Sequence, residues 1–407
     1  MDELLGLYIH IPFCASHCSY CHFVIDLARG EVQQHYTEAL IKEIEQWGDQ
    51  RPSSLDKCVD TLYIGGGTPS WIPASSIERI LRALRRSFHF TRNIEATIEV
   101  NPDSIDEEKI ARYREAGINR VSVGVQSFDD AELKQLGRAH TAGEAERAIA
   151  QLRWGGFNNL SIDLLAGLPG QTLSQWKEPF SRVATLAPEH VSLYLFDLDE
   201  ESTLGKKVLQ RGDLSKNRTS RNPLSTLPDE DELKRIYDFS VSELDRIGYG
   251  QYEISNFARR DGPMNFSARA FRSRHNLKYL NMQPYLGLGC AAHSYLPPYR
   301  WRNENSTGSY VQSLFLGNDP RRDIEKIAPA RLAEDAFIFG LRQTEGVDYA
   351  ALSKLLGRDA RSMFRQVVDP LMKEGWLIER QDTLRLAPKS ILVSNEIFER
   401  FLDAKES

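Results

Sequence analysis

Three cysteines stand close together near the start of the chain, in the segment LYIHIPFCASHCSYCHF. They are Cys14, Cys18 and Cys21, spaced C-x3-C-x2-C directly after an apolar run. Thiolates bind soft metals, and three of them can hold three irons of a [4Fe–4S] cube and leave the fourth iron open to another ligand. A zinc ion with His17 or His22 as its fourth ligand is the alternative. A purely structural role would not account for three thiols so close together.

Other groups able to bind a ligand follow the apolar segments of the first half of the chain. The turn YIGGGTPS places glycines at the end of such a segment, where the missing side chains let the backbone approach a ligand closely. Carboxylates, an amide and a guanidinium occupy similar places elsewhere: Glu99, Gln126, Arg138 and Asp163. Each has an ordinary explanation, since Glu99 can cap a helix, Asp163 can form a buried ion pair and the other two can lie at the surface. Gathered at one edge, they would instead form a site for a ribose, an amine and a carboxylate.

Predicted strands and helices alternate in this half of the chain. Apolar, β-branched segments predict strands at 6–13, 60–67, 95–102, 120–128, 160–170 and 190–199. Amphipathic periodicity predicts helices between them at 32–47, 74–88, 105–116, 142–155 and 173–186. Near-continuous apolar strands in this alternation are typical of a parallel sheet, either doubly wound or an incomplete barrel. The incomplete six-stranded (β/α) barrel is favoured, because the ligand-binding groups fall at strand ends that meet at one mouth of a barrel.

The remainder of the chain predicts two further regions. The first begins with a polar loop at 211–228 and a helix at 230–247, and then shows few periodic signals. The second predicts helices at 329–341, 348–355 and 359–374 and a hairpin at 375–388, as in a winged-helix module. Residues 330–407 carry 12 Lys and Arg against 13 Asp and Glu, which favours packing or partner contact over nucleic-acid binding. We therefore divide the chain into a barrel over 1–205, an α+β extension over 206–328 and a winged-helix-like domain over 329–407.

Composition places the chain among globular proteins and argues against several other classes. Of its 407 residues, 41% are apolar and 27% charged, and the net charge of −6 gives no attraction to nucleic acid or anionic membranes. The first residues are acidic rather than basic, which argues against a secretory signal, and no apolar run reaches the roughly 18 residues of a membrane span. We expect a cytoplasmic protein, in which clustered cysteines bind metal rather than form disulfides.

Motifs along nearly the whole chain resemble one family. They are YIHIPFC, GGGTPS, EVNP, GVQSF, DLLAGLPGQT, YEISNFA, HNLKY and GLGCAAHS. This set is similar to the radical S-adenosylmethionine (SAM) superfamily, in particular to the oxygen-independent coproporphyrinogen III oxidases and their haem-chaperone branch. The resemblance implies that Cys14, Cys18 and Cys21 bind a [4Fe–4S] cluster, whose fourth iron is chelated by the amine and carboxylate of SAM. It also implies SAM contacts at the matching positions, which are Tyr8, Gly66, Gly67, Thr68, Glu99, Gln126, Arg138 and Asp163. An electron donor would reduce the cluster, and SAM would be cleaved to methionine and a 5′-deoxyadenosyl radical.

Two functions agree with this resemblance. An oxidase would convert propionates of coproporphyrinogen III to vinyl groups, whereas a chaperone would bind haem and pass it to an acceptor protein. The oxidase branch has a further cysteine where Phe23 stands, and the chaperone branch has phenylalanine there. HNLKY also resembles the chaperone branch, which implies His275 as an axial haem ligand and Tyr279 as part of the haem-facing wall. Leu280 replaces the tryptophan that ends this motif, and His293 is an alternative ligand. We therefore expect a haem chaperone without oxidase activity; charge argues against a nucleic-acid binder with a redox-sensing cluster.

Replacing any one of Cys14, Cys18 and Cys21 with alanine should abolish the iron–sulfur absorbance of anaerobically reconstituted protein, because each thiolate is predicted to hold one iron. Cys58→Ala and Cys290→Ala are the matched controls, since both cysteines lie far from the cluster motif and should leave the absorbance unchanged. Anaerobically purified protein that contains zinc but no iron or sulfide would contradict the prediction.

Overall fold

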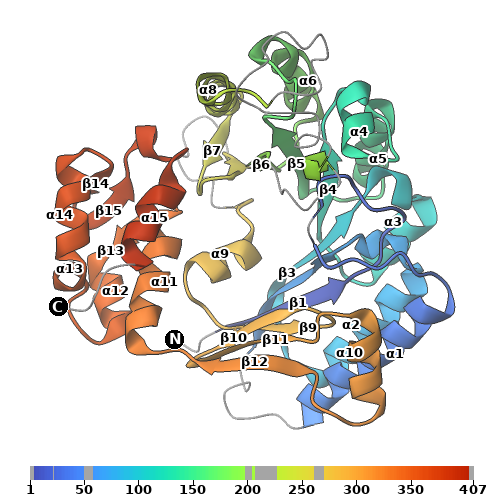
Figure 1. Ribbon diagram of the computed structural model, residues 1–407. Coiled ribbons are helices and arrows are strands. Elements are labelled where there is room, and N and C mark those ends of the chain that lie inside the picture. Colours follow the sequence, from blue (N-terminus) through green and yellow to red (C-terminus); the bar gives the residue numbers. More distant parts are fainter. Residues whose placement is uncertain are drawn as a thin grey trace.

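One open sheet dominates the structure, a computed structural model that describes residues 4–21, 23–49, 58–197, 204–206, 227–260 and 270–402 (Figure 1). Within these residues the sheet has twelve strands in the order β12-β11-β10-β9-β1-β2-β3-β4-β5-β6-β8-β7. It curves round a central space, and its edge strands β12 and β7 do not pair with each other. The predicted incomplete barrel is therefore confirmed.

Six parallel strands form the middle of the sheet in sequence order. They are β1 (Leu5–Ile11), β2 (Val59–Gly66), β3 (Phe90–Val100), β4 (Arg120–Gln126), β5 (Leu160–Ala166) and β6 (His190–Leu195). The helices that connect them cover the outside of the curve: α1 (Glu31–Asp49), α2 (Ala74–Ser87), α3 (Glu107–Glu115), α5 (Ala142–Trp154) and α6 (Leu173–Leu186). All of these elements lie where the periodicity predicts them, within a few residues at their ends.

Strand β1 shows how the two sides of the sheet differ. Leu7, Ile9 and Ile11 are completely buried in the apolar core that the sheet forms with the outer helices. Tyr8 and His10 alternate with them and therefore point into the central space, because successive side chains of a strand leave opposite faces. Polar and aromatic groups thus face the inside of the barrel, where a ligand can reach them.

Short strands, mostly in antiparallel pairs, extend the sheet on both sides of these six. Strand β9 (Tyr285–Leu288) pairs in parallel with β1, and β10 (His293–Leu296), β11 (Tyr299–Asn303) and β12 (Arg321–Lys326) follow it. On the other side β8 (Asn256–Arg259) and β7 (Tyr249–Gln251) continue from β6, next to α8 (Glu230–Arg246). α10 (Thr307–Phe315) packs against α1. These strands occupy the region in which the sequence shows few periodic signals.

Helix α9 (Arg274–Leu280) lies inside the barrel, at the amino ends of the first strands (Figure 1). The Lys278 ammonium donates to the Leu4 carbonyl at 3.1 Å and pairs with Asp60 at 2.7 Å. Arg274 donates to the Asn93 carbonyl at 2.7 Å. Because these partners precede or begin β1, β2 and β3, α9 covers the base of the barrel and leaves the carboxyl ends of the strands open.

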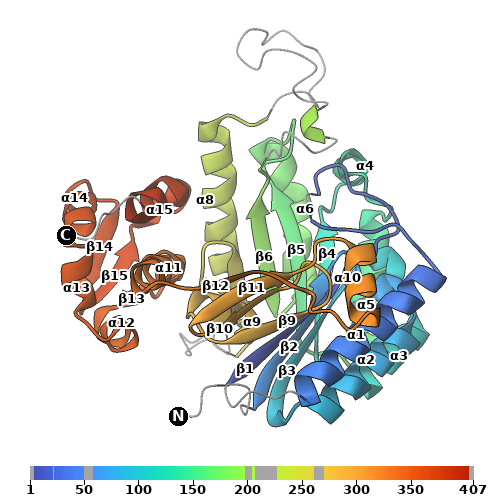
Figure 2. The same ribbon diagram turned by 60° about the horizontal axis from the view of Figure 1, so that its bottom comes forward.

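A second apolar core lies in the C-terminal part of the chain, which stands beside the barrel in Figure 2. Its helices are α11 (Pro329–Leu341), α12 (Tyr349–Leu356), α13 (Ala360–Met363), α14 (Arg365–Lys373) and α15 (Ser394–Leu402). Its sheet has the order β13-β15-β14, with β13 (Val347–Asp348), β14 (Leu377–Arg380) and β15 (Thr383–Leu386). The predicted hairpin is β14–β15, so a winged-helix-like arrangement is present.

Two features of this part differ from expectation. The helix expected over 359–374 is interrupted at Phe364, whose φ of −114° and ψ of 19° are not helical. The interruption turns the Phe364 ring into the core, with centroids 4.5 Å from Phe337 and 5.5 Å from Phe401. Helix α15, which carries Phe401, was not expected from the sequence.

Two sequence-based expectations lie largely or wholly outside the described residues. The polar loop at 211–228 falls there except for its last two residues, and His22 falls there too. Within the described ranges, no helix combines the length and apolar character needed to span a bilayer.

Phe337→Ala should lower the stability of the C-terminal part by about 3–5 kcal/mol, because the ring is completely buried and leaves a cavity. Phe315→Ala is the control, since Phe315 is 49% exposed on α10 and its loss should cost about 0.5 kcal/mol or less. Urea denaturation followed by circular dichroism measures both values. Equal destabilisation by the two substitutions would show that the second core is not packed as described.

Candidate active site

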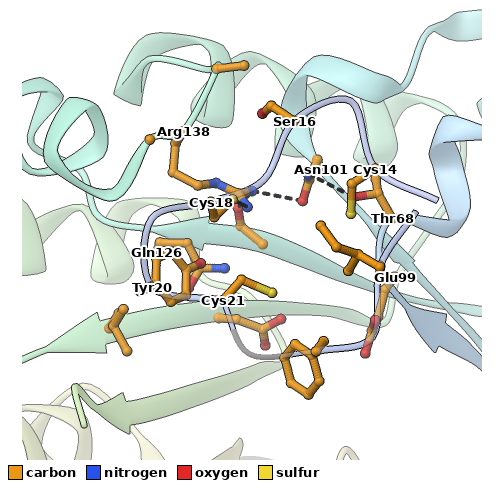
Figure 3. Close-up of a pocket in the computed structure, with 18 of the residues that line it drawn as sticks. Cys14, Ser16, Cys18, Tyr20, Cys21, Thr68, Glu99, Asn101, Gln126 and Arg138 are labelled. Carbon is orange, nitrogen blue, oxygen red and sulfur yellow. Dashed lines mark hydrogen bonds between the residues drawn. The ribbon is translucent and has the colours of Figure 1, made fainter. Parts of the chain in front are cut away.

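The carboxyl ends of the parallel strands surround a cavity of about 390 Å³, called the first cavity (Figure 3). Its lining includes every residue predicted to bind the cluster or SAM except Tyr8: Cys14, Cys18, Cys21, Gly66, Gly67, Thr68, Glu99, Gln126, Arg138 and Asp163. Residues far apart in sequence meet because parallel strands end at the same edge of a sheet. Their convergence is a structural observation, and their roles as ligands remain predictions.

The cysteines lie on a loop between β1 and α1 that borders this cavity (Figure 3). The Cys14 N–H donates to the Asp26 carbonyl at 3.1 Å, and the Asp26 N–H donates to the Pro12 carbonyl at 2.8 Å. Farther along, the Ser19 N–H donates to the carbonyl of Leu136, the last residue of α4 (Asp130–Leu136), at 3.0 Å. Hydrogen bonds therefore hold the loop both at its base and at its far side.

The thiols have polar neighbours but are largely removed from water. Cys14 Sγ lies 3.4 Å from Thr68 Oγ1, and Arg138 Nη1 donates to Cys18 Sγ at 3.5 Å. Burial raises the pKa of the Cys14 thiol to about 11 and also raises the pKa of Cys21. Burial therefore favours the neutral thiol at Cys14 and Cys21, and a bound cation would favour the thiolate.

The glycine turn packs directly against the cysteine loop. Gly66 has a φ of +119°, which an L side chain rarely adopts. A Cβ atom on Gly67 would lie 2.8 Å from the Pro12 carbonyl oxygen and 2.9 Å from Cys14 Sγ. Both positions therefore require glycine, and the turn forms a side-chain-free wall beside Cys14.

Glu99 lies near the end of β3 with its carboxylate in the first cavity (Figure 3). The Tyr63 hydroxyl donates to Oε1 at 2.7 Å, and the Gly66 N–H donates to Oε2 at 3.1 Å. Burial nevertheless raises the pKa of Glu99 to about 7, against the effect of both hydrogen bonds. A ligand that donates to this carboxylate would stabilise its charged form.

Asp163 occupies the middle of β5 and faces the same cavity. Ser122 Oγ on β4 lies 3.2 Å and 3.3 Å from its two carboxylate oxygens. Burial raises the pKa of Asp163, although its hydrogen bonds and the charges of Arg120 and Arg138 act in the opposite direction. The sequence left open whether this acid forms a buried ion pair, and no ion pair to Asp163 occurs among the described residues within 4.0 Å.

Gln126 ends β4 in an unusual backbone conformation, with a φ of +68°. The pairing of β4 with β5 shifts register between Val123 and Gln126, as in a β-bulge. A bulge redirects the side chain that follows it, and here the Gln126 amide lines the first cavity. Left-handed conformations of residues other than glycine concentrate at functional sites, which supports a binding role.

Arg138 crosses the rim of the cavity toward the cysteine loop (Figure 3). Its Nη2 donates to Asn101 Oδ1 at 2.8 Å and to the Gly124 carbonyl at 2.9 Å. Its Nε is buried and has no hydrogen-bond partner among the described residues. Asn101 in turn donates to Thr68 Oγ1 at 3.2 Å, so a chain of polar contacts links the rim to the glycine turn.

Comparisons with known proteins agree with this geometry. Residues 8–181 match the radical SAM superfamily, and residues 327–393 match the HemN C-terminal domain. The chain is 30% identical to the heme chaperone HemW of Bacillus subtilis over 396 residues, which cover 97% of this chain and 98% of that protein. It is also 30% identical to the HemW of Escherichia coli over 405 residues, 98% of each chain. The chain belongs to the HemW family of radical SAM proteins. The coproporphyrinogen III oxidase HemN of Escherichia coli has the same fold, with a TM-score of 0.80 over 98% of this chain and 90% of that one at 23% identity.

Like other radical SAM proteins, this HemW-family protein uses a [4Fe–4S] cluster and SAM, and the first cavity fits both. Among the described residues, no three His, Cys, Asp or Glu side chains converge on a point that could hold a single metal ion. A cube requires wider spacing, because each thiolate takes its own iron. His17, one ligand of the alternative zinc site, does not line the first cavity. The unpaired Arg138 Nε and the buried carboxylates offer partners for the polar groups of SAM.

A second cavity of about 640 Å³ adjoins the first, and Phe23 lines both. Tyr8 lies in this second cavity rather than in the first. Aromatic and basic side chains dominate its lining, with His10, Tyr279, Tyr285, His293 and Arg302 among them. The cavity is within the size range of small-molecule sites in proteins.

The two residues predicted to bind haem have different positions. Tyr279 lines the second cavity, whereas His275 is 1% exposed and does not. His275 Nδ1 lies 2.9 Å from Thr61 Oγ1, and Nε2 lies 2.8 Å from the Tyr279 hydroxyl. Burial lowers the pKa of His275 to about 3, so the imidazole is neutral. Leu280, where the motif usually has tryptophan, is not part of the described lining, but His293 is exposed and is part of it.

Several lining residues of the first cavity were not predicted. They include Tyr20, Asn101, Ser122 and Tyr194. Period-two alternation could have indicated two of them, since Asn101 follows Glu99 by two positions and Ser122 precedes Gln126 by four. Tyr194 follows Ser192 by two positions in β6 and carries a similar signal, whereas Tyr20 lies in a loop and carries none.

Asp163→Asn should weaken SAM binding by about 10- to 100-fold, because it removes one charged partner of a hydrogen bond in a buried site. Calorimetric titration of the reconstituted protein with SAM measures the change. Since a raised pKa means that folding penalises the charged carboxylate, the substitution should not lower the melting temperature at neutral pH.

Glu108→Gln, on the exposed surface of α3, is the control and should leave the SAM affinity and the melting temperature unchanged. Unchanged SAM affinity in Asp163→Asn would contradict a ligand role. A fall in melting temperature together with lost affinity would indicate a structural role instead.

Proposed function

We propose that this protein is a haem chaperone, which binds haem and transfers it to an acceptor protein. Curated relatives in five species that align along nearly the whole chain carry the name heme chaperone HemW. The observation that carries the proposal in this structure is the second cavity, which is walled by aromatic rings and shares Phe23 with the first. A flat aromatic macrocycle would stack on such walls.

The cofactors would occupy the first cavity in this proposal. Cys14, Cys18 and Cys21 would each hold one iron of the cluster. Glu99 and Asp163 would accept hydrogen bonds from SAM, and the wall of Gly66, Gly67 and Thr68 would meet it with backbone groups. Gln126 and Arg138 would orient its remaining polar groups at the rim. Bound there, the cluster and SAM supply one-electron chemistry, while the barrel keeps water away.

Oxidation of coproporphyrinogen III is the second candidate, because the shared fold accommodates that reaction in HemN. Phe23 argues against it in this chain, since the resemblance places a cysteine of the oxidases at this position. A phenylalanine ring cannot provide the thiol chemistry of a cysteine, but it can pack against a bound porphyrin.

The parts of the chain outside the two cavities would serve the transfer of haem to its acceptor rather than the binding of haem or cofactors. We divide it into the barrel over 1–205, the cavity-facing extension over 206–328 and the winged-helix-like domain over 329–407. The last domain, with its nearly balanced charge, would contact a protein such as the haem acceptor rather than nucleic acid.

A separate electron donor would reduce the cluster, and we infer that the protein works in the cytoplasm.

Anaerobic titration of the reconstituted protein with ferric haem should give saturable binding, and Val24→Trp should weaken it about tenfold or more by filling part of the second cavity. Val32→Trp is the matched control, because Val32 on α1 is similarly exposed, at 41% against 37% for Val24. Both variants should keep the iron–sulfur absorbance.

The same preparation should form no vinyl product from coproporphyrinogen III. Vinyl product in the absence of saturable haem binding would favour the oxidase and overturn the chaperone proposal.

A further inference from the structure

We infer that His140 is a positioning residue of the first cavity, whose imidazole donates to the Val125 carbonyl and so holds the Gln126 side chain toward SAM. The inference rests on the SAM contact proposed for Gln126, and it adds a residue that does not itself line the cavity. His140 is 3% exposed and lies between α4 and α5, in the segment GRAH at 137–140.

The backbone around Gln126 forms a turn that residues other than glycine rarely adopt. Gln126 has a φ of +68°, and the Ser127 N–H donates to the Val125 carbonyl at 2.9 Å. A hydrogen bond from residue i+2 to residue i across a central residue with positive φ defines the rarer, strained form of the γ-turn. Strained backbone persists only where the surrounding structure holds it. The groups that hold this turn therefore decide where the Gln126 amide points.

The His140 ring is one of these groups. Its Nε2 lies 3.1 Å from the Val125 carbonyl oxygen, and because a carbonyl can only accept, Nε2 carries the proton and donates. Burial lowers the pKa of His140 to about 4, so the ring is neutral at physiological pH. Its other nitrogen, Nδ1, is buried without a hydrogen-bond partner in the described part of the chain. The hydrogen bonding of this buried ring is thus directed to the turn.

The residue after Gln126 is held from a different direction. The Ser127 hydroxyl donates to Glu132 Oε2 and accepts from the Asp129 N–H at 3.0 Å. Both partners belong to the beginning of α4. With this residue held by α4 and the carbonyl before the turn held by the imidazole, Gln126 has little freedom to leave its left-handed conformation.

The Gln126 amide is directed into the first cavity and is available to a ligand there. It makes no hydrogen bond to any residue that the structure describes. A Cβ on Gly124 would lie 3.1 Å from Gln126 Nε2, 3.1 Å from Asn101 Oδ1 and 3.4 Å from Arg138 Nη2, so the amide lies among the polar groups of the rim. If the turn relaxed to extended backbone, the side chain would leave in another direction and the amide would be lost from this group.

The contacts of the cysteine loop with α4 do not depend on His140. The Leu136 carbonyl accepts from the Ser19 N–H at 3.0 Å, and the Gln135 carbonyl accepts from the Ser19 hydroxyl at 3.0 Å. Replacement of His140 should therefore alter the turn at Gln126 and leave the cluster loop in place.

Calorimetric titration of the full-length, cluster-reconstituted protein with SAM tests the inference in a double-mutant cycle. Gln126→Ala and His140→Leu should each weaken SAM binding about tenfold, because the first removes the amide and the second removes the contact that aims it. The double variant should be no more than about twofold weaker than either single variant, since His140 acts through Gln126. Retained iron–sulfur absorbance would show that the variants fold.

His140→Gln should restore the affinity to within about threefold of wild type, because the glutamine amide can donate from nearly the same place as Nε2. His140→Asn, whose amide is one bond shorter, should not restore it, and this polar pair keeps the test valid if leucine prevents folding. His190→Leu is the control for loss of a buried histidine, because His190 contacts Ser161 and Tyr252 and does not line the first cavity. It should leave the SAM affinity within about threefold of wild type.

Losses that multiply to about 100-fold in the double variant would overturn the inference, because His140 would then act independently of Gln126. Wild-type affinity in His140→Leu or in Gln126→Ala would also overturn it, as would equal losses in His140→Leu, His140→Gln and His190→Leu. Each of these results would leave the chaperone function intact. Wild-type protein that binds SAM but no haem would instead refute the proposed function and leave the role of His140 standing.

Discussion

The contact between the glycine turn and the cysteine loop is the constraint on which the site depends. The Gly67 N–H donates to the Ile11 carbonyl at 2.8 Å, and the Thr68 N–H donates to the Phe13 carbonyl at 2.8 Å. These bonds continue the parallel ladder of β1 and β2 beyond the strands and into the loop that carries Cys14. The position of the first thiol is therefore set by the register of the sheet rather than by the loop alone. Any side chain on Gly67 would push against this junction, because its Cβ would lie within 3.0 Å of three loop atoms.

The same register buries acidic groups that the fold does not neutralise fully. Glu99 and Asp163 face one cavity, and burial raises the pKa of both carboxyls. The charge of Arg120 lowers the pKa of both carboxyls. Arg120 forms no ion pair with either acid within 4.0 Å in the described part of the chain. Two incompletely compensated acids lower the stability of a folded chain, and a ligand that donates hydrogen bonds to them would offset this cost on binding. The cavity is thus prepared for a polar cofactor at some expense of stability.

The sequence predicted the parts of the structure that follow a regular period. Alternating apolar strands and amphipathic helices located the barrel, and strand ends located the residues of the first cavity. It did not reveal β7 to β12, because strands of three to six residues at the margins of a sheet carry too few buried positions to show a period. The interruption at Phe364 and the left-handed Gln126 were equally hidden, since tertiary packing and a β-bulge, rather than local propensity, impose them. The position of His275 beneath Tyr279 depends on contacts with β2, which sequence alone does not place.

Phe23 lines both cavities, at the position where the sequence resemblance predicts a difference between the chaperones and the oxidases. The ring is 60% exposed, yet it borders both cavities, so a ligand in either one would cover apolar surface that water now contacts. Complete burial of such a side chain contributes about 1.5–3 kcal/mol, and part of that gain is available to whichever ligand binds. A cysteine at this position would place a polarisable, reactive sulfur next to the cluster loop instead. Phenylalanine keeps the boundary chemically inert, which would suit the proposed haem chaperone, because its cargo and its cluster would both be redox-active.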